Sequence, residues 1–251
     1  MIENTIVRRN RKALKALSFS LTFPSAPLVE LAARAGFDAA HLYGEHGAFT
    51  PESVDLMCRV ANGYGMSVTA RVPDVTASTI NLWLDRGVQG IVGPHIETAE
   101  EAQRLADACL FPPDGRRSWG GGRGTEFNDA VRLRADHGGK LGFARWSNRN
   151  MLVIAQIESR RGYDNLTAIL KVKGLTGITG GPNDFAASLG HPGEPDHPER
   201  VALTTDAEAR ARKAGKRVAS DLIVGLGVEE MMLGMARDFV AKHTKDRVGP
   251  R

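Results

Sequence analysis

Two carboxylates stand at the ends of successive apolar, β-branched segments of the chain. Glu158 ends one such segment, and Asp184 follows the next, one strand–helix unit further on. At neighbouring strand ends they would offer oxygen ligands to Mg²⁺ or another hard divalent ion that keeps positions open for water and substrate. A structural explanation stays open, in which Glu158 pairs with Arg160 or Arg161 and Asp184 caps a helix. The spacing therefore indicates a metal site, and structural roles for both carboxylates are the alternative.

A histidine and an arginine follow earlier segments of the same kind. His46 lies in the sequence Gly44-Glu45-His46, and an imidazole there can act as a general base at neutral pH. Arg71 ends the next segment, and a buried guanidinium needs an anionic partner. We expect Arg71 to face a carboxylate ligand, an enolate or one of the neighbouring acids. An exposed or merely hydrogen-bonded His46 and a structural ion pair at Arg71 are the alternatives.

An alternation of short strands and longer helices predicts how these segment ends meet. The predicted strands cover residues 18–23, 37–43, 67–72, 88–92, 151–157, 176–179 and 217–224. The predicted helices cover residues 25–36, 51–64, 76–86, 98–110, 130–136, a stretch near Arg145, 162–172, 198–214 and 228–243. Such alternation is typical of a parallel sheet with helices outside it and with the active site at the carboxyl ends of the strands. Seven strands are one fewer than a (β/α)8 barrel needs.

Composition narrows the class of protein. The 251 residues carry 33 Lys and Arg against 29 Asp and Glu, with 42% hydrophobic residues, which is typical of a globular domain. A dispersed net charge of +4 does not favour a nucleic-acid partner, and we expect no membrane span or secretory signal. Cys58 and Cys109 fit two buried thiols in a reducing cytoplasm. We therefore expect a cytoplasmic protein.

The least regular stretch covers residues 111–129, where prolines and glycines indicate a long loop. Its glycine-rich part, from Gly115 to Gly124, lacks the Lys-Ser/Thr pair of a phosphate-binding P-loop. We predict an active-site lid instead. No linker divides the chain, so residues 1–251 are predicted to form a single domain.

Several motifs together resemble one family. GFDAAHLYGEH, Arg71, FPPDGRRS, QIES and GPNDFAASLG are similar to the HpcH/HpaI family of class II pyruvate aldolases, which includes hydroxy-oxo-heptanedioate aldolase and macrophomate synthase. The resemblance runs from about Lys12 to Pro198. It implies a TIM-like (β/α)8 barrel in a homo-oligomer, a hexamer or another trimer-based assembly. In such assemblies the terminal helix, here residues 228–244, packs on a neighbouring subunit.

The resemblance also implies a reaction and roles in it. The reaction is reversible cleavage of a 4-hydroxy-2-oxo acid to pyruvate, or a related 2-oxo acid, and an aldehyde, through a metal-bound enolate with Mg²⁺, Mn²⁺ or Co²⁺ as cofactor. Glu158 and Asp184 match the metal ligands and His46 the base. Arg71 matches the arginine that steadies the enolate, and Asp85 the acid that raises the basicity of the histidine.

Four further residues match substrate-binding positions of the family. Gln156 corresponds to the glutamine near the keto oxygen, while Gly181 and Asn183 correspond to backbone positions that hold the pyruvate carboxylate. Tyr43 stands where the family usually has Asp, so we expect the range of aldehydes to differ.

The C-terminus departs from the family pattern as well. After residues 217–224 the chain goes almost directly to the helix at 228–243, where the family has a further helix and strand. We therefore expect a shortened or atypically closed last unit. An acyl-CoA lyase of the citramalyl or malyl type on the same scaffold and a non-catalytic metal-binding relative are the alternative functions.

Overall fold

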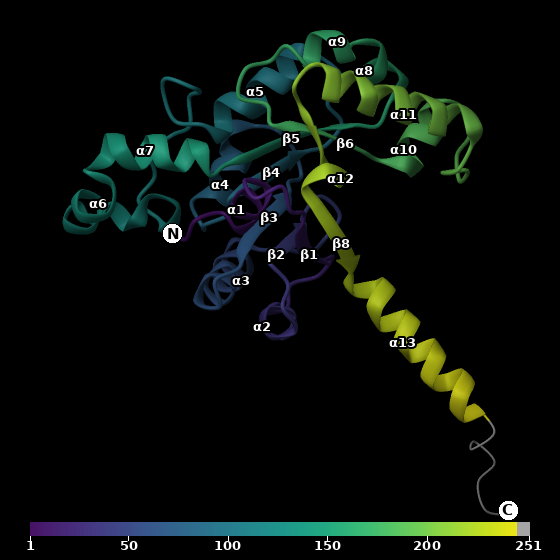
Figure 1. The fold of residues 1–251 in the computed structure, drawn as a ribbon, viewed down its shortest axis with the longest axis horizontal. Helices are drawn as coiled ribbons and strands as arrows, with labels where there is room; N and C mark the ends of the chain where they lie inside the picture. The colour runs from purple at the N-terminus through teal and green to yellow at the C-terminus, as the bar shows by residue number, and fades with distance from the viewer. Residues whose placement is uncertain (245–251) are drawn as a thin grey trace, which may run out of the picture.

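The computed structural model describes residues 1–244, in which eight parallel strands form one curled sheet with helices on its outside (Figure 1). The strands are β1 (Ala16–Leu21), β2 (Ala39–Tyr43), β3 (Ser67–Arg71), β4 (Gly90–Gly93), β5 (Leu152–Ile157), β6 (Gly177–Gly180), β7 (Arg217–Val218) and β8 (Ile223–Gly227). They lie in the order β7-β6-β5-β4-β3-β2-β1-β8. Each strand thus pairs with its neighbour in the chain until β8 returns to β1, which confirms the TIM-like α/β class.

The helices follow the strands as the alternation predicts. They are α1 (Thr5–Asn10), α2 (Ala26–Ala35), α3 (Pro51–Gly63), α4 (Ala77–Leu84), α5 (Ala99–Cys109), α6 (Ala130–His137), α7 (Lys140–Arg149), α8 (Arg160–Asp164), α9 (Leu166–Ile169), α10 (Pro182–Ser188), α11 (Pro198–Lys213), α12 (Ala219–Leu222) and α13 (Val228–His243). The predicted helix at 162–172 is wrong in detail, since Asn165 separates α8 from α9.

The count of seven strands is also wrong. Residues 217–224 hold two strands, because the helical turn α12 separates the two-residue β7 from β8. Within residues 1–244 the two strands do not pair with each other, and α12 contacts both of them together with β6. The last strand–helix unit is therefore present but short, and the sheet stays open between β7 and β8. This agrees with the expectation of an atypically closed C-terminal unit.

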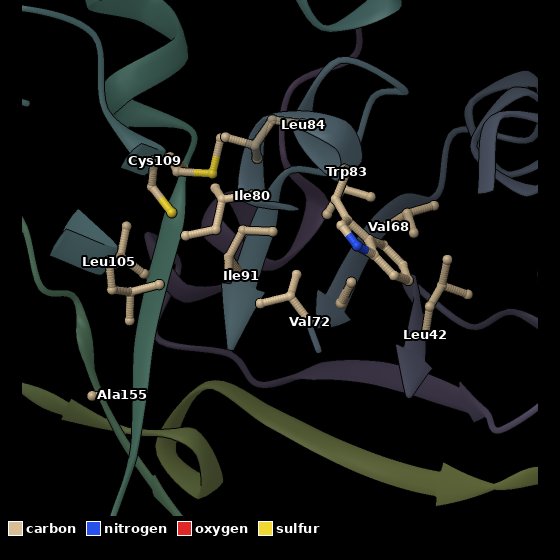
Figure 2. Packing of buried hydrophobic residues seen from close by; sticks show 14 of the residues in the cluster. Leu42, Val68, Val72, Ile80, Trp83, Leu84, Ile91, Leu105, Cys109 and Ala155 are labelled. Atoms are coloured by element: carbon tan, nitrogen blue, oxygen red, sulfur yellow. The ribbon is translucent and has the colours of Figure 1, made fainter. Parts of the chain in front are cut away.

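Side-chain alternation along the strands separates the core from the barrel interior. Leu42, Val68 and Ile91 point outward from β2, β3 and β4 toward Ile80 and Trp83 of α4 (Figure 2). Since successive strand residues face opposite sides, the residues on either side of Leu42 face inward. The main core thus lies between sheet and helices, and the interior combines polar side chains such as His41 and Thr69 with a smaller apolar cluster that includes Leu152, Ile154 and Leu222.

Local sequence determines where the helices begin. Thr50 and Thr98 each accept a hydrogen bond from the backbone three residues on, at Ser53 and Glu101, whose side chains bond back to the capping residue. Such reciprocal caps satisfy backbone groups that a helix start leaves unpaired. Because α3 and α5 start just after the carboxyl ends of β2 and β4, these caps hold the loops at that end of the sheet.

Helix α1 closes the opposite end of the barrel. Asn4, its N-cap, is fully buried, and its side-chain amide donates to the carbonyls of Gln89 and Asn150, both at 2.9 Å. Thr5 Oγ1 donates to the carbonyl of Asp38 at 2.6 Å. Access from solvent to the interior is thereby left to the carboxyl end.

The two cysteines, Cys58 and Cys109, are buried and unpaired, as predicted. In the part of the chain that the structure describes, no helix combines the length and the apolar character that crossing a membrane requires.

His41 on β2 faces the interior of the barrel, where its Nδ1 lies 2.9 Å from Thr69 Oγ1. Burial within the barrel, helped by the charge of Arg71, lowers the pKa of His41 from 6.5 to about 4. The folded protein therefore holds His41 neutral over a pH range in which the unfolded chain takes up a proton.

This difference predicts an acid-labile fold. Between pH 6.5 and 4 the unfolded chain binds more protons at His41 than the folded one, so the free energy of unfolding falls as the pH falls, by at most about 3 kcal/mol. In His41→Gln this contribution disappears. The free energy of unfolding, measured by urea denaturation at pH 7, 6 and 5, should therefore depend less steeply on pH than in the wild type. Thr69→Val, which keeps the histidine, serves as control. An unchanged slope in His41→Gln would contradict the assignment.

Candidate active site

A cavity of about 400 Å³ runs from the carboxyl ends of the strands into the barrel. Six of the predicted site residues line it: Tyr43, Arg71, Gln156, Gly181, Asn183 and Asp184. They come from β2, β3, β5 and the start of α10. Strand ends that are far apart in the sequence therefore meet at one rim, as a parallel sheet requires.

Glu158 follows β5 directly and is only 2% exposed. Gln156 Nε2 donates a hydrogen bond to its Oε2, and the backbone N–H of His95 donates to its Oε1 at 2.9 Å. Gly181 lies against the same carboxylate, because a Cβ there would stand 1.9 Å from Oε2. The glycine of GPND is thus explained by the close approach of Glu158.

The structural alternative for Glu158 is wrong. Arg160 pairs with Asp164 at 3.0 Å, and Arg161 pairs with Glu97 at 3.3 Å. Neither guanidinium neutralises Glu158, whose Oε1 instead lies 3.1 Å from His95 Nδ1 and which otherwise accepts hydrogen bonds from Gln156 and the His95 backbone. A buried carboxylate of this kind needs a further positive partner.

Asp184 lies in the first turn of α10 and is exposed. Its side chain makes no cap hydrogen bond to the helix, so the capping alternative is wrong as well. Burial raises the pKa of Tyr43, opposed by Arg71 and reinforced by the charges of Glu45, Glu158 and Asp184. Three carboxylates therefore act on one phenol at the rim.

Arg71 is buried at the end of β3, and its partner is Glu45. Arg71 Nε lies 2.5 Å from Glu45 Oε2, although neither atom makes an aligned hydrogen bond. The guanidinium also covers the ring of Tyr43, 4.1 Å from its centre. Gly44 lets the backbone beside it run close to β3 and α4, since a Cβ there would lie 2.4 Å from Trp83 and 2.8 Å from the Arg71 carbonyl. Arg71 thus forms an ion pair inside the site itself.

Glu45 is a site residue that the sequence reasoning missed. Besides Arg71, its carboxylate lies 3.0 Å from His95 Nε2 and 3.8 Å from His46 Nε2. The motif Gly44-Glu45-His46 contained it, yet the residue sits beyond the end of β2, where strand alternation no longer tells which way a side chain points. Its neighbour Arg71, a buried cation in need of an anion, was the available indication.

His46 stands at the outer edge of the rim, 63% exposed. Its ring lies 5.8 Å from that of Tyr43. This position gives an imidazole access both to the cavity mouth and to water.

Asp85 is not brought to the rim. It caps the C-terminal end of α4, the helix that leads from the carboxyl end of β3 back to the start of β4. Its carboxylate lies against Gly120, and Arg117 acts on its charge. Within one chain Asp85 is thus separated from His46, which lies beside Tyr43 and Glu45.

The loop at residues 111–129 follows the outside of the barrel. Arg123 pairs with Asp55 of α3 at 3.3 Å, Arg117 donates to Ser147 of α7 at 3.4 Å, and Glu126 pairs with the amino group of Met1. The loop therefore does not cover the strand ends of its own chain, where the lid prediction put it.

The donors at the rim fit a divalent metal ion. Glu158 presents a buried carboxylate directly behind two residues of the cavity lining, Gln156 and Gly181, with no arginine or lysine side chain against it. Asp184 presents an exposed carboxylate that lines the cavity itself. Carboxylate oxygens suit Mg²⁺ and Mn²⁺, and the open cavity leaves room for substrate oxygens.

Among the described residues, the one group of three histidine or acidic side chains whose possible ligand atoms lie close together is outside the cavity. His191, His197 and Glu199 have ligand atoms within 4.8 Å of one another. The two imidazoles stack with centres 3.5 Å apart and planes 15° apart, and His197 Nδ1 already accepts the Glu199 backbone N–H. Parallel rings do not point their lone pairs at one ion, so the rim is the better metal site.

Comparisons with known proteins agree with this geometry. A model of the HpcH/HpaI aldolase/citrate lyase family matches residues 21–243. A 4-hydroxy-2-oxovalerate aldolase of Rhodococcus jostii is 34% identical over 201 residues, which cover 80% of this chain and 74% of that protein. A 2-keto-3-deoxy-L-rhamnonate aldolase of Escherichia coli K12 is 30% identical over 242 residues, or 96% of this chain and 87% of that protein.

The fold has a close counterpart among solved structures. An HpcH/HpaI aldolase from Desulfitobacterium hafniense superposes with a TM-score of 0.85 at 21% identity, covering 97% of this chain and 98% of that one. The family match includes every strand end that carries a rim residue. On this ground, the chain belongs to the HpcH/HpaI aldolase/citrate lyase family.

Proposed function

We propose that the protein is a divalent-metal-dependent aldolase, which reversibly cleaves a 4-hydroxy-2-oxo acid to pyruvate, or a related 2-oxo acid, and an aldehyde. The observation that carries the proposal is the meeting of Asp184 and Arg71 at one cavity, with the buried Glu158 behind its wall. Relatives named as aldolases of 2-oxo acids support this reaction class. The family's activities make the chain a carbon–carbon lyase.

Glu158 and Asp184 would hold the ion. Bound there, Mg²⁺, Mn²⁺ or Co²⁺ would supply Lewis-acid polarisation of the substrate's 2-oxo group. Gln156 keeps Glu158 in place through its amide hydrogen bond. Gly181 and Asn183, at the start of α10, offer backbone N–H groups to the substrate carboxylate, since a helix start favours anions.

Arg71 would stabilise the negative charge that develops in the reaction, and His46 would transfer the proton. Breaking the bond between C3 and C4 moves an electron pair onto the 2-oxo oxygen, and the fixed positive charge of Arg71 stabilises the anion that develops. His46 takes the proton from the C4 hydroxyl, at the exposed mouth of the cavity. The reverse reaction returns that proton to the new hydroxyl.

Metal dependence is the first test. Pyruvate release from a 4-hydroxy-2-oxo acid, followed through a coupled dehydrogenase, should stop with EDTA and return with Mn²⁺ or Mg²⁺. Glu158→Gln and Asp184→Asn should each lower kcat/KM by about 10³-fold or more, because a Lewis-acid contact contributes several kcal/mol to transition-state stabilisation. His191→Asn, in the other cluster, should keep the wild-type rate. Full activity in metal-free protein would exclude the proposal.

The same preparations distinguish the two alternatives. An acyl-CoA lyase would cleave a CoA thioester in place of the free acid. A non-catalytic relative would bind the metal but would not exchange the methyl protons of pyruvate for solvent deuterium.

The assembly proposed for this enzyme is a homo-oligomer joined through α13. This helix projects from the rest of the chain (Figure 1) and contacts β1 and β8 at its base. Met232, Met235 and Phe239 recur at helical spacing and are exposed, as on a helix face that packs against another surface. In such an assembly, the rim of one subunit would receive Asp85 and the loop at residues 111–129 from a neighbouring copy of the chain.

Charges on this face should break the assembly. In the double variant Met235→Glu/Phe239→Glu, two buried interface side chains become charged, so we expect a smaller particle by size-exclusion chromatography with light scattering. Arg237→Glu, which places the same residue on the opposite face of α13, should keep the wild-type mass. A double variant with unchanged mass would rule α13 out as the interface.

A cytoplasmic location completes the proposal. The two unpaired thiols, Cys58 and Cys109, support a reducing compartment. Small-molecule oxo acids and aldehydes are the proposed partners.

A further inference from the structure

The cavity at the carboxyl ends of the strands continues deep into the barrel. Its lining includes Gln156, near the carboxyl end of β5, and also Leu152, the first residue of that strand. A rise of about 3.3 Å per residue places these two about 13 Å apart along the strand. Ile6 of α1, the helix that closes the opposite end, lines the cavity as well. The site at the rim therefore opens into a space that reaches most of the length of the barrel.

Apolar side chains form the deep part of this space. His41 and Thr69, two polar residues of its wall, are hydrogen-bonded to each other at 2.9 Å. The charged lining residues, Arg71 and Asp184, lie at the rim. An apolar cavity favours an apolar group over water. We call this part the barrel chamber, and its apolar lining consists of Ile6, Val92, Leu152, Ile154, Leu222 and Ile223.

The volume of the cavity exceeds what pyruvate needs. It measures about 400 Å³, which is within the range of pockets that enclose drug-sized ligands. Pyruvate has only a methyl group beyond its carboxylate and keto group. Val92 is partly exposed although β4 lies in the middle of the sheet, so its side chain faces open space inside the barrel. Because protein interiors are otherwise close-packed, this space suits a larger substrate.

The proposed site determines which part of the substrate faces the barrel chamber. In that site the start of α10, at Gly181 and Asn183, binds the carboxylate, and His46 meets the C4 hydroxyl at the exposed mouth. The aldehyde portion, which begins at C4, therefore extends toward the mouth. The remaining substituent on C3 is the one that can turn toward the interior.

We propose that the barrel chamber binds an apolar substituent on C3, so that the 2-oxo acid formed by cleavage is a longer homologue of pyruvate with an unbranched alkyl chain. The inference rests on the aldolase function proposed above and names the substrate class of the same site. Cleavage of the bond between C3 and C4 then releases this longer acid in place of pyruvate, with the same transfer of the hydroxyl proton to His46.

Isothermal titration of the Mg²⁺-loaded protein with pyruvate, 2-oxobutanoate and 2-oxopentanoate tests the barrel chamber. We expect Kd to fall by about two- to fourfold for each added methylene, since each is buried against apolar side chains. Leu152→Phe, which fills the chamber far from the rim, should abolish this gain, and Leu152→Ala should extend it to 2-oxohexanoate. Leu141→Phe, the same substitution at an exposed position of α7, should keep the wild-type series.

A Kd that stays constant or rises with chain length in the wild type would overturn the proposal, and so would a series that neither Leu152 variant changes. Where Leu152→Phe does not fold, the series in Leu152→Ala decides. Exchange of the C3 protons for solvent deuterium separates this inference from the proposed function. Exchange in pyruvate together with a flat affinity series leaves the aldolase standing without the chamber. No exchange in any of the acids overturns both.

Discussion

The arrangement of the rim depends on one buried ion pair, between Arg71 and Glu45. A guanidinium at the end of a fully buried strand is costly unless an anion lies against it, and Glu45 supplies that anion from the neighbouring strand end. The pair also positions the second oxygen of Glu45 toward His95. Gly44, next to Glu45, lets the backbone pass close to Trp83 and to the carbonyl of Arg71. Charge neutralisation in the interior thus determines the geometry of the site.

The sequence predicted the rim better than it predicted the barrel's closure. Arg71, Gln156 and Asp184 could be expected at one cavity because the carboxyl ends of parallel strands meet at one edge. Asp85 could not be placed by motif, since it ends a helix and its side of the barrel depends on packing. The sequence pattern did not reveal that residues 217–224 contain parts of two strands, because β7 has only two residues, too few to show an alternation of side chains. Glu45 was missed because it lies beyond a strand.

Tyr43 changes the character of the rim relative to the aspartate that the family resemblance implies. Burial and three nearby carboxylates raise its pKa, so the phenol stays neutral at physiological pH and can donate a hydrogen bond. A carboxylate at this position could only accept. The ring under Arg71 also contributes a cation–π contact, worth about 0.5–2 kcal/mol. Compared with an aspartate at this position, Tyr43 therefore replaces an anionic hydrogen-bond acceptor at the mouth of the cavity by an apolar ring with a hydroxyl donor.

The pairing of β8 with β1 has a consequence for synthesis of the chain. Ala16 lies opposite Ile223, so one edge of β1 stays unpaired until residues 223–227 have left the ribosome. Closing so long a loop is slow, and unpaired edges invite strands of other chains.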